Sequence, residues 1–201
     1  QLVEAGVVEG WNDPRMPTLS GMRERGYPAE AIRDFCSRIG VAKANSVVDI
    51  ALLEHCVREN LNENATRAMA VLKPLKLIIE NYPEGATETV EIENNPNKEG
   101  AGTHTATFSR ELFIEESDFS LNPPAKYFRL KPGGMVRLKG SYIVEYTGCD
   151  VDENGNVKEV RCKYIEDSKS GGANAGIKVK GVIHWVNAND CVDVTVNRFD
   201  Y

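Results

Sequence analysis

The sequence has little of what would place the chain in a membrane or in an oxidising compartment. None of its apolar runs approaches the roughly 20 residues that a membrane-spanning helix requires. Its five cysteines are odd in number and scattered, and none forms a C-x-x-C pair, so neither a zinc site nor a disulfide framework is indicated. Reduced thiols in a cytoplasmic protein without a membrane partner are the simplest interpretation.

Signatures of self-contained catalysis are also missing. The sequence contains no G-x-x-x-x-G-K-[ST] loop, no G-x-G-x-x-G between strand and helix, and no G-x-S-x-G. Its three histidines are far apart and none lies in H-E-x-x-H, and no thiol is flanked by a recognisable base. We therefore expect no catalytic residue and no metal site in this chain, and a binding or accessory module is favoured.

Length and composition are those of an ordinary globular chain. With 201 residues, 41% hydrophobic and 27% charged, it suits one large domain or two small ones with a sizeable core. This composition argues against wholesale disorder. The chain begins Gln1-Leu2-Val3-Glu4, without Met and without the order of a signal peptide, so we expect a cut inside a longer chain.

The first third of the chain has a helical period. Pro28 suits the first turn of a helix whose apolar stripe ends at Gly40. Ser46 and Asp49 resemble a capping box in front of a second helix. The helical pattern loosens at 62–64, resumes over 67–71 and is closed by a proline at position 74.

From position 75 the period changes from helix to strand. Strands are expected at 75–79, 87–92, 105–114, 135–139, 141–149, 157–165, 176–186 and 191–198. Asn154-Gly155 favours a tight turn between two of them. Many short strands without crossover helices are typical of a barrel or a sandwich. The class is therefore α+β, with a helical segment at 1–74 and an antiparallel sheet structure, expected as a β-barrel, at 75–201.

Charge is segregated within the strand region, although the net charge of −6 argues weakly against a nucleic-acid partner. No acidic residue occurs between Ser120 and Val144, or between Ser168 and Asn189. These two stretches contain Lys126, Arg129, Lys131, Arg137, Lys139, Lys169, Lys178 and Lys180. A barrel with one basic face can bind a polyanion despite a negative total charge, and ordinary solvated lysines are the alternative.

A specific motif stands at 10–18, where the sequence reads G-W-N-D-P-R-M-P-T. It resembles the G-W-D-D-P-R-[ML]-P-T segment of class I glutaminyl-tRNA synthetases, with Asn12 replacing the first Asp. Further blocks follow in order over essentially the whole chain, ending with K-G-V-I-H-W-V at 180–186. Glutamyl-tRNA synthetases of the archaeal and eukaryotic type share many of these blocks, but the string at 181–185 is more like the glutaminyl branch.

The resemblance implies a fragment of a larger enzyme. Residues 1–74 would be a helical subdomain that ends the catalytic region and docks tRNA, and 75–201 a truncated proximal anticodon-binding β-barrel. The full enzyme would activate glutamine with ATP and Mg²⁺ and transfer it to the 3′ end of glutamine tRNA isoacceptors. It would not bind DNA and would be a monomer. The HIGH-like and KMSKS-like signatures are absent from this chain, so we expect the fragment alone to be inactive and to bind no cofactor.

The resemblance also suggests RNA-binding residues. In the family, the basic stretch before G-V-I-H-W touches the anticodon, which points to Lys178 and Lys180. These lysines flank Val179 on an expected strand, so both should face the same side. A second anticodon-contacting position falls on His104, where some bacterial members have arginine, which offers more hydrogen-bond donors.

Secondary candidates are Arg110, Arg129 and Arg137 for phosphate contacts, and Asn81 and Glu84 at a hinge near the inner elbow of the tRNA. Arg129 and Arg137 could instead form structural ion pairs. Trp11, Asp13 and Arg15 are expected to form a structural knot, and Phe35, Phe113 and Trp185 to be core residues.

Two other functions remain open at this point. A glutamyl-tRNA synthetase of the archaeal or eukaryotic type has the same architecture. A β-barrel interaction module with no RNA partner is a different class, which salt-insensitive protein binding without tRNA affinity would favour.

Overall fold

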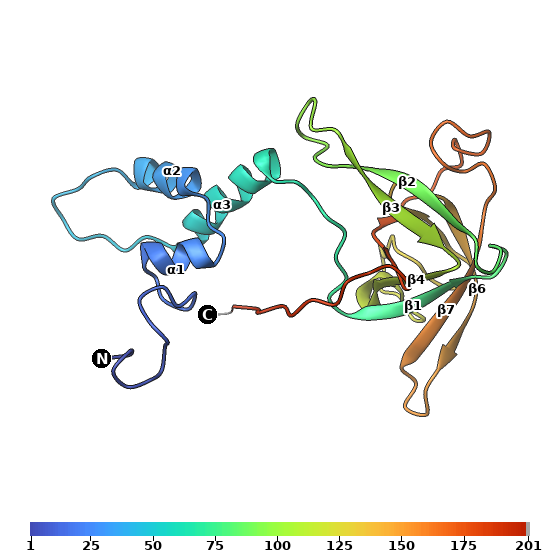
Figure 1. Ribbon diagram of the computed structural model, residues 1–201, viewed down its shortest axis with the longest axis horizontal. Helices are drawn as coiled ribbons and strands as arrows, with labels where there is room; N and C mark the ends of the chain where they lie inside the picture. Colours follow the sequence, from blue (N-terminus) through green and yellow to red (C-terminus); the bar gives the residue numbers. More distant parts are fainter. Residues whose placement is uncertain (200–201) are drawn as a thin grey trace. The chain divides into compact units, whose positions relative to one another are not determined.

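The computed structural model describes residues 1–199, which divide into two compact units (Figure 1). Of the described residues, the helical unit comprises 1–66, 95–101 and 197–199, and the barrel unit comprises 67–94 and 102–196. The helices are α1 (Leu19–Glu24), α2 (Ala29–Ile39) and α3 (Ile50–Asn64). The last two residues of the expected barrel segment, 200–201, lie outside the described residues.

Local signals account for the helices. The Thr18 side chain caps α1 by accepting a 2.9 Å hydrogen bond from the Gly21 amide. Gly40, at φ 65°, ends α2 where the sequence predicts. Helices α2 and α3 enclose a small core, into which Phe35 packs as a partly buried residue. The buried members of this core are Ala31, Leu53, Cys56 and Val57.

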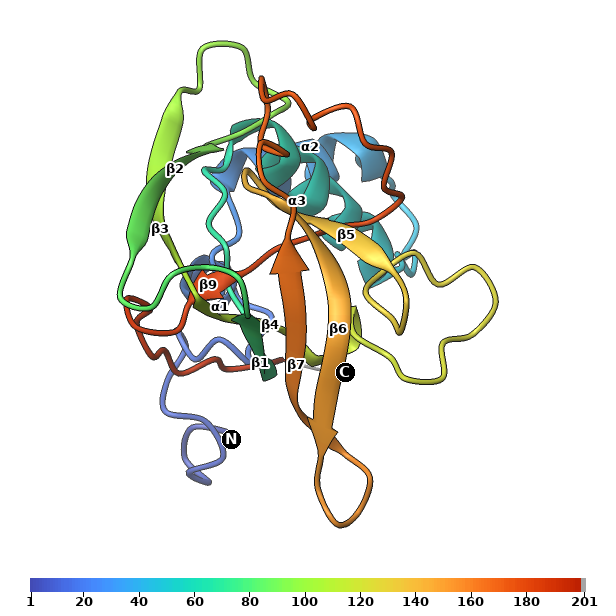
Figure 2. The same cartoon turned by 90° about the vertical axis from the view of Figure 1, so that its right-hand side faces the viewer.

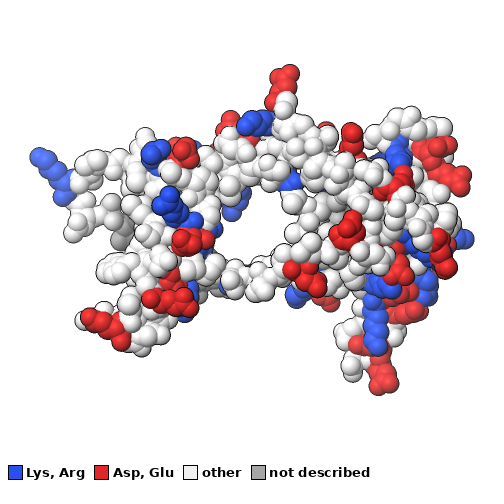
Figure 3. All heavy atoms as spheres, viewed as in Figure 1, with Lys and Arg blue, Asp and Glu red and all other residues white. Residues whose placement is uncertain are grey.

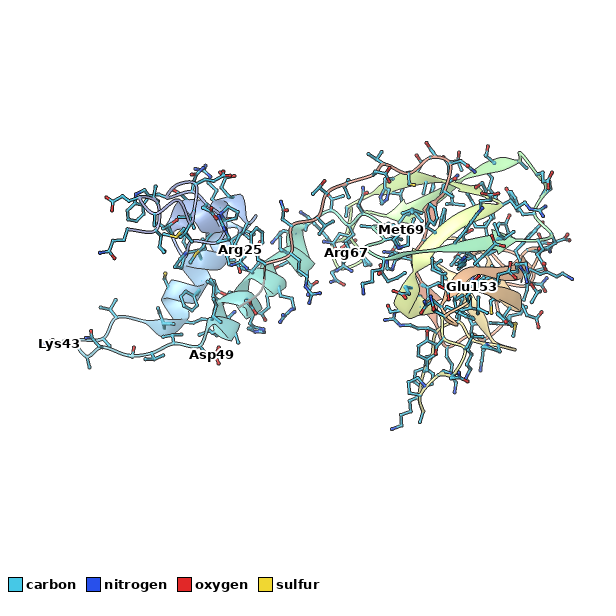
Figure 4. The ribbon with its side chains drawn as sticks, turned by 90° about the horizontal axis from the view of Figure 1, so that it is seen from below. Arg25, Lys43, Asp49, Arg67, Met69 and Glu153 are labelled. Carbon is cyan, nitrogen blue, oxygen red and sulfur yellow. The ribbon has the colours of Figure 1, made fainter. Side chains whose placement is uncertain are left out.

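Two expectations for the helical region are wrong. Helix α3 begins at Ile50, because Asp49 rather than Ser46 caps it by accepting a 2.9 Å hydrogen bond from the Ala51 amide. The connection before it contains no helix, and Figure 4 shows Lys43 at its outer end and Asp49 at the start of α3. The stretch 67–71 is not helical either.

Helix α3 stops at Asn64 for a tertiary reason. The side-chain amide of Asn95 donates to the carbonyl oxygens of Asn62, Glu63 and Ala65, at 3.3, 3.0 and 3.1 Å. These carbonyls need partners outside the helix. A residue about thirty positions downstream therefore helps to fix the end of the helix, in the stretch 62–64 where the helical pattern of the sequence loosens.

The barrel unit contains a curled seven-stranded sheet in the order β8-β5-β6-β7-β1-β4-β9 and a separate β2-β3 pair. In Figure 2 the strands β5, β6 and β7 follow one another around the curve. The strands are β1 (Pro74–Ile79), β2 (Thr87–Glu93), β3 (Thr103–Ser109), β4 (Glu111–Glu115), β5 (Met135–Leu138), β6 (Ile143–Val151), β7 (Val157–Tyr164), β8 (Val182–Ile183) and β9 (Val186–Asn187). A 3-10 turn, η1 (Glu116–Asp118), follows β4.

The predicted α+β class with a barrel-like sheet is confirmed, but the sheet is mixed rather than wholly antiparallel. Strand β1 pairs with β7 in parallel, and so does β5 with β8. Parallel pairs need long connections, and here other strands of the barrel unit supply them in place of α-helices. Strand periodicity contains no information on these long-range pairings.

The core of the barrel unit follows the alternation of its strands. Leu112 and Ile114 of β4 are fully buried, so Phe113 between them faces the other side and is half-buried, contrary to the expectation that it is a core residue. Trp185 is fully buried as predicted, and its Nε1 donates a 3.0 Å hydrogen bond to the Lys139 carbonyl.

The strands predicted at 176–186 and 191–198 are largely wrong. Only β8 and β9, each of two residues, form in this part of the chain. Strand β5, the partner of β8, is itself only four residues long, so the parallel ladder ends quickly. Val192, Val194 and Val196 alternate as a strand would, but no strand among the described residues pairs with them and they are exposed.

Among the described residues, no helix has the length and apolar character needed to cross a bilayer. Within residues 1–199, no cluster of three or more His, Cys, Asp or Glu side chains is arranged to hold a metal ion.

Candidate RNA-binding site

The barrel unit has a groove of about 400 Å³ between two segments that are far apart in the sequence. One wall is the loop at 123–131 with the turn that leads into β5, and the other is the segment 178–181 that leads into β8. Of the described residues that line it, five are cationic and none is acidic. The five cations are Lys126, Arg129, Lys131, Lys178 and Lys180.

The groove contains basic side chains without the acidic ones that accompany them elsewhere on the barrel unit. On the face of the barrel unit seen in Figure 3, basic and acidic side chains are mingled. The lining of the groove differs because it draws on the two stretches of sequence that lack Asp and Glu. A concave surface with charge of one sign raises the local concentration of counter-ions, here anions.

Close backbone contacts hold the two walls of the groove together. The Arg137 amide donates a 2.9 Å hydrogen bond to the carbonyl of Gly181 as β8 joins β5. A Cβ atom at position 181 would lie 2.0 Å from the carbonyl oxygen of Phe128 and 3.3 Å from Cγ1 of Val136. Only glycine allows this approach, so the segment with the two lysines is fixed against the loop.

Lys178 and Lys180 both lie in the groove, on a segment that is not a strand. Their exposure still alternates with that of Val179, which is half-buried while both lysines are exposed. The Nζ atom of Lys180 lies 5.4 Å from the centroid of the Phe128 ring, a cation–π distance.

Arg129 lies in the groove and is also part of an ion pair. Its guanidinium contacts the carboxylate of Asp118, whose side chain is only 2% exposed. The Leu130 amide donates a 3.0 Å hydrogen bond to the Asp118 carbonyl, which ties the same loop to η1. This ion pair anchors the loop, while about half of the Arg129 side chain stays exposed.

Arg137 does not line the groove. Its guanidinium donates to three backbone carbonyls, those of Ser168 at 2.5 Å, Ala175 at 3.1 Å and Ser141 at 3.3 Å. Ser168 and Ala175 belong to the loop between β7 and β8, which leads to Lys178. Arg137 therefore fixes the loop between β7 and β8 to strand β5.

The other predicted site residues lie away from the groove lining. His104 is on β3, with Nδ1 2.8 Å from Oδ1 of Asn94. Arg110 follows β3, donates to the Tyr82 carbonyl at 3.3 Å and lies 3.8 Å from the exposed carboxylate of Glu84.

At the end of β1, the Asn81 side chain forms the two hydrogen bonds to a neighbouring strand that a backbone residue would form. Its side-chain amide donates to the Tyr164 carbonyl at 3.0 Å, and its Oδ1 accepts from the Tyr164 amide at 2.9 Å. The structure thus brings together Lys178, Lys180 and Arg129 of the predicted site residues. It adds Lys126 and Lys131, which the acid-free run after Ser120 contains without showing that they face Lys178 and Lys180. It also adds Phe128, which no sequence pattern indicated.

The motif at 10–18 forms a local knot around Asp13. Its buried carboxylate accepts hydrogen bonds from the Arg15 amide, Nε and Nη2 at 2.9, 2.9 and 2.7 Å, and from the Glu9 amide at 3.1 Å. The hydrogen bonds from Arg15 hold the pKa of this carboxyl well below its ordinary value. The expected knot forms between Asp13 and Arg15, whereas Trp11 is 73% exposed.

Family comparisons agree with this geometry. Residues 65–165 match the anti-codon binding domain of tRNA synthetases class I (E and Q), and residues 1–63 match the catalytic domain of the same family. The chain belongs to the class I tRNA synthetases of the E and Q group. The resemblance inferred from the motifs is thereby confirmed.

Relatives narrow the similarity to one branch of this family. The chain is 59% identical over 200 residues to a glutamine–tRNA ligase of Clostridium perfringens, covering 100% of this chain and 36% of that protein. It is 57% identical over 188 residues to the glutamine–tRNA ligase of Bradyrhizobium diazoefficiens, covering 94% of this chain and 34% of the relative. The chain thus spans about a third of the length of these relatives.

Proposed function

We propose that this chain docks tRNA and recognises its anticodon loop, as part of a glutamine–tRNA ligase. The observation that carries the proposal is the groove, whose lining has five cations and no acidic residue among the described residues. Its loop wall at 123–131 lies within residues 65–165, which match the anti-codon binding domain, and its other wall at 178–181 follows that range. Sequence-specific RNA recognition targets unpaired loop bases, with cations on the phosphates and hydrogen bonds or stacking on the bases. The groove offers both kinds of contact.

The two parts of the chain would have different roles. Residues 1–74 would dock the tRNA at the end of the catalytic region, and 75–201 would form the anticodon-binding barrel. The full enzyme would use ATP and Mg²⁺ to activate glutamine and would transfer it to glutamine tRNA isoacceptors, acting as a cytoplasmic monomer. The free thiols of the described cysteines fit a reducing compartment. The fragment by itself would bind RNA without catalysing activation.

The predicted site residues divide by their surroundings. Lys178 and Lys180 are the proposed anticodon contacts, with Arg129 beside them on phosphate. His104, Arg110 and Glu84 remain proposed contacts outside the groove. For Arg137 and Asn81, which are engaged with backbone groups, we propose that they act by positioning the strands and loops that reach the RNA.

A binding titration tests the proposal. The whole chain is titrated with glutamine tRNA and with the same tRNA carrying altered anticodon bases, at low and high salt. We expect discrimination between the two RNAs, and we expect Lys178→Ala combined with Lys180→Ala to abolish it. The matched control is Lys158→Ala with Lys163→Ala, which removes the same charge from exposed positions on β7.

Other outcomes of this titration separate the alternatives. Salt-sensitive binding without discrimination would assign the lysines to backbone contacts and place base reading elsewhere in the enzyme. Equal affinity for glutamate tRNA would favour the glutamyl-tRNA synthetase alternative. Absence of tRNA binding would favour a protein-interaction module, and pyrophosphate exchange by this chain alone would refute its assignment as a non-catalytic part.

A further inference from the structure

We propose that Phe128 is a stacking platform for one unpaired base of the bound RNA loop. The inference rests on the proposed function, because it names the surface of the groove that a base would contact. No motif in the sequence marks this residue.

The exposure of Phe128 is unusual for a phenylalanine of the barrel unit. Among the described residues of this unit, Phe108 and Phe119 are buried and Phe113 is half-buried, whereas Phe128 is 51% exposed. An aromatic ring of this size leaves water when it can. Its position in a groove, rather than on a convex surface, indicates that a ligand covers it.

The residues on either side of Phe128 explain why its ring stays exposed. The Tyr127 hydroxyl donates a 3.0 Å hydrogen bond to the Ser117 carbonyl. On the other side, Arg129 is paired with Asp118 and Leu130 is fully buried. The loop is therefore pinned before and after Phe128, so a base would meet a ring whose position is already fixed.

The charge around the ring selects the class of ligand. The ammonium of Lys180 lies 5.4 Å from the ring centroid, and the four other cations of the groove surround the same surface. Aromatic side chains in basic grooves bind single-stranded nucleic acid, because any base can stack on the ring while cations hold its phosphate. An apolar protein segment would leave these cations without partners, and an acidic one would pair with the cations but would not use the face of the ring. An unpaired nucleotide uses both, so we favour it.

The test uses the whole chain and hairpin RNAs with the anticodon-loop sequence, in which each loop nucleotide in turn is made abasic. We expect Phe128→Leu to weaken binding of the intact hairpin by about tenfold or more, and Phe128→Tyr to retain it. A hairpin that is abasic at one particular position should bind the unmodified chain more weakly, to a similar extent. The same abasic position should not further lower the affinity of Phe128→Leu. Val151→Ala, which removes an apolar side chain of the barrel unit that is also 51% exposed but lies outside the groove lining, is the control and should bind normally.

A second readout requires no variant. Hairpins with 5-iodouridine at single loop positions are irradiated with the unmodified chain, and the cross-linked peptide is identified by mass spectrometry. We expect a cross-link to Phe128 from one loop position.

The possible failures are distinguishable. If Phe128→Leu binds every hairpin as the unmodified chain does, or if the effects of the variant and of each abasic position multiply, stacking on Phe128 is refuted while anticodon reading by Lys178 and Lys180 stands. If an apolar peptide reduces the solvent exposure of Phe128 and RNA does not, an unpaired nucleotide is the wrong class of ligand for this ring. If the unmodified chain binds no hairpin, the proposed function itself fails and this inference with it.

Discussion

The Arg137 guanidinium donates a 2.5 Å hydrogen bond from Nη1 to the carbonyl oxygen of Ser168. This contact joins β5 to the loop between β7 and β8, which leads into the lysine-bearing wall of the groove. An arginine that was first a candidate for a phosphate contact is thus occupied by the protein backbone. Its proposed effect on RNA binding is to position Lys178 and Lys180.

Replacing Arg137 with Lys should separate positioning from phosphate contact. A lysine has no planar fork and cannot reproduce donation to three carbonyls, so we expect a loss of about 2 kcal/mol in the free energy of unfolding by urea. RNA affinity should fall while the dependence of affinity on salt concentration keeps its slope, because no phosphate contact is lost. Lys178→Ala should reduce that slope by about one. A reduced slope for Arg137→Lys would show that Arg137 contacts phosphate after all.

Gly181→Ala should open the groove. The added methyl group would lie 2.0 Å from the Phe128 carbonyl oxygen, so the two walls must move apart. We expect a destabilisation of about 1–3 kcal/mol by thermal unfolding, together with weaker RNA binding. Gly176→Ala is the matched control, since apart from the glycine itself and its two chain neighbours no heavy atom lies within 4 Å of the position of its added Cβ. Equal stability of the two variants would contradict the close approach of the walls.

Because of Asp13, the stability of the helical unit should depend on pH in the acidic range. Its pKa is lowered in the folded protein, whereas in the unfolded chain the carboxyl takes up a proton near its ordinary value of about 4. The stabilisation is therefore complete above this value and declines as the pH falls below it towards the folded pKa. In thermal unfolding followed by helical ellipticity, Asp13→Asn should be less stable than the unmodified chain at neutral pH.

The difference in thermal stability between Asp13→Asn and the unmodified chain should shrink below about pH 4. Glu99→Gln, which neutralises an exposed carboxylate of the same unit, serves as the control and should show no such convergence. A constant difference between Asp13→Asn and the unmodified chain at all pH values would assign the role of Asp13 to packing rather than to its charge.

Local patterns in the sequence were sufficient for much of the fold. The stripe that ends at Gly40 predicts α2, since three-residue and four-residue spacings place apolar side chains on one face whatever lies opposite. The turn signal at Asn154-Gly155 lies between β6 and β7, with Gly155 at φ 83°. The motif at 10–18 and the blocks that follow it in order over essentially the whole chain were enough to indicate the family.

The sequence by itself therefore determined the α+β class, the family, most strands and the two acid-free stretches that supply the groove. Only the tertiary structure decided that these stretches face each other, that Phe128 stays exposed between them and that Arg137 turns towards backbone carbonyls. Periodicity reports which side of an element is buried, but not which distant segment covers it. The parallel pairing of β5 with β8 and the close approach at Gly181 bring Lys178 and Lys180 to Phe128, and both depend on contacts across more than forty residues of chain.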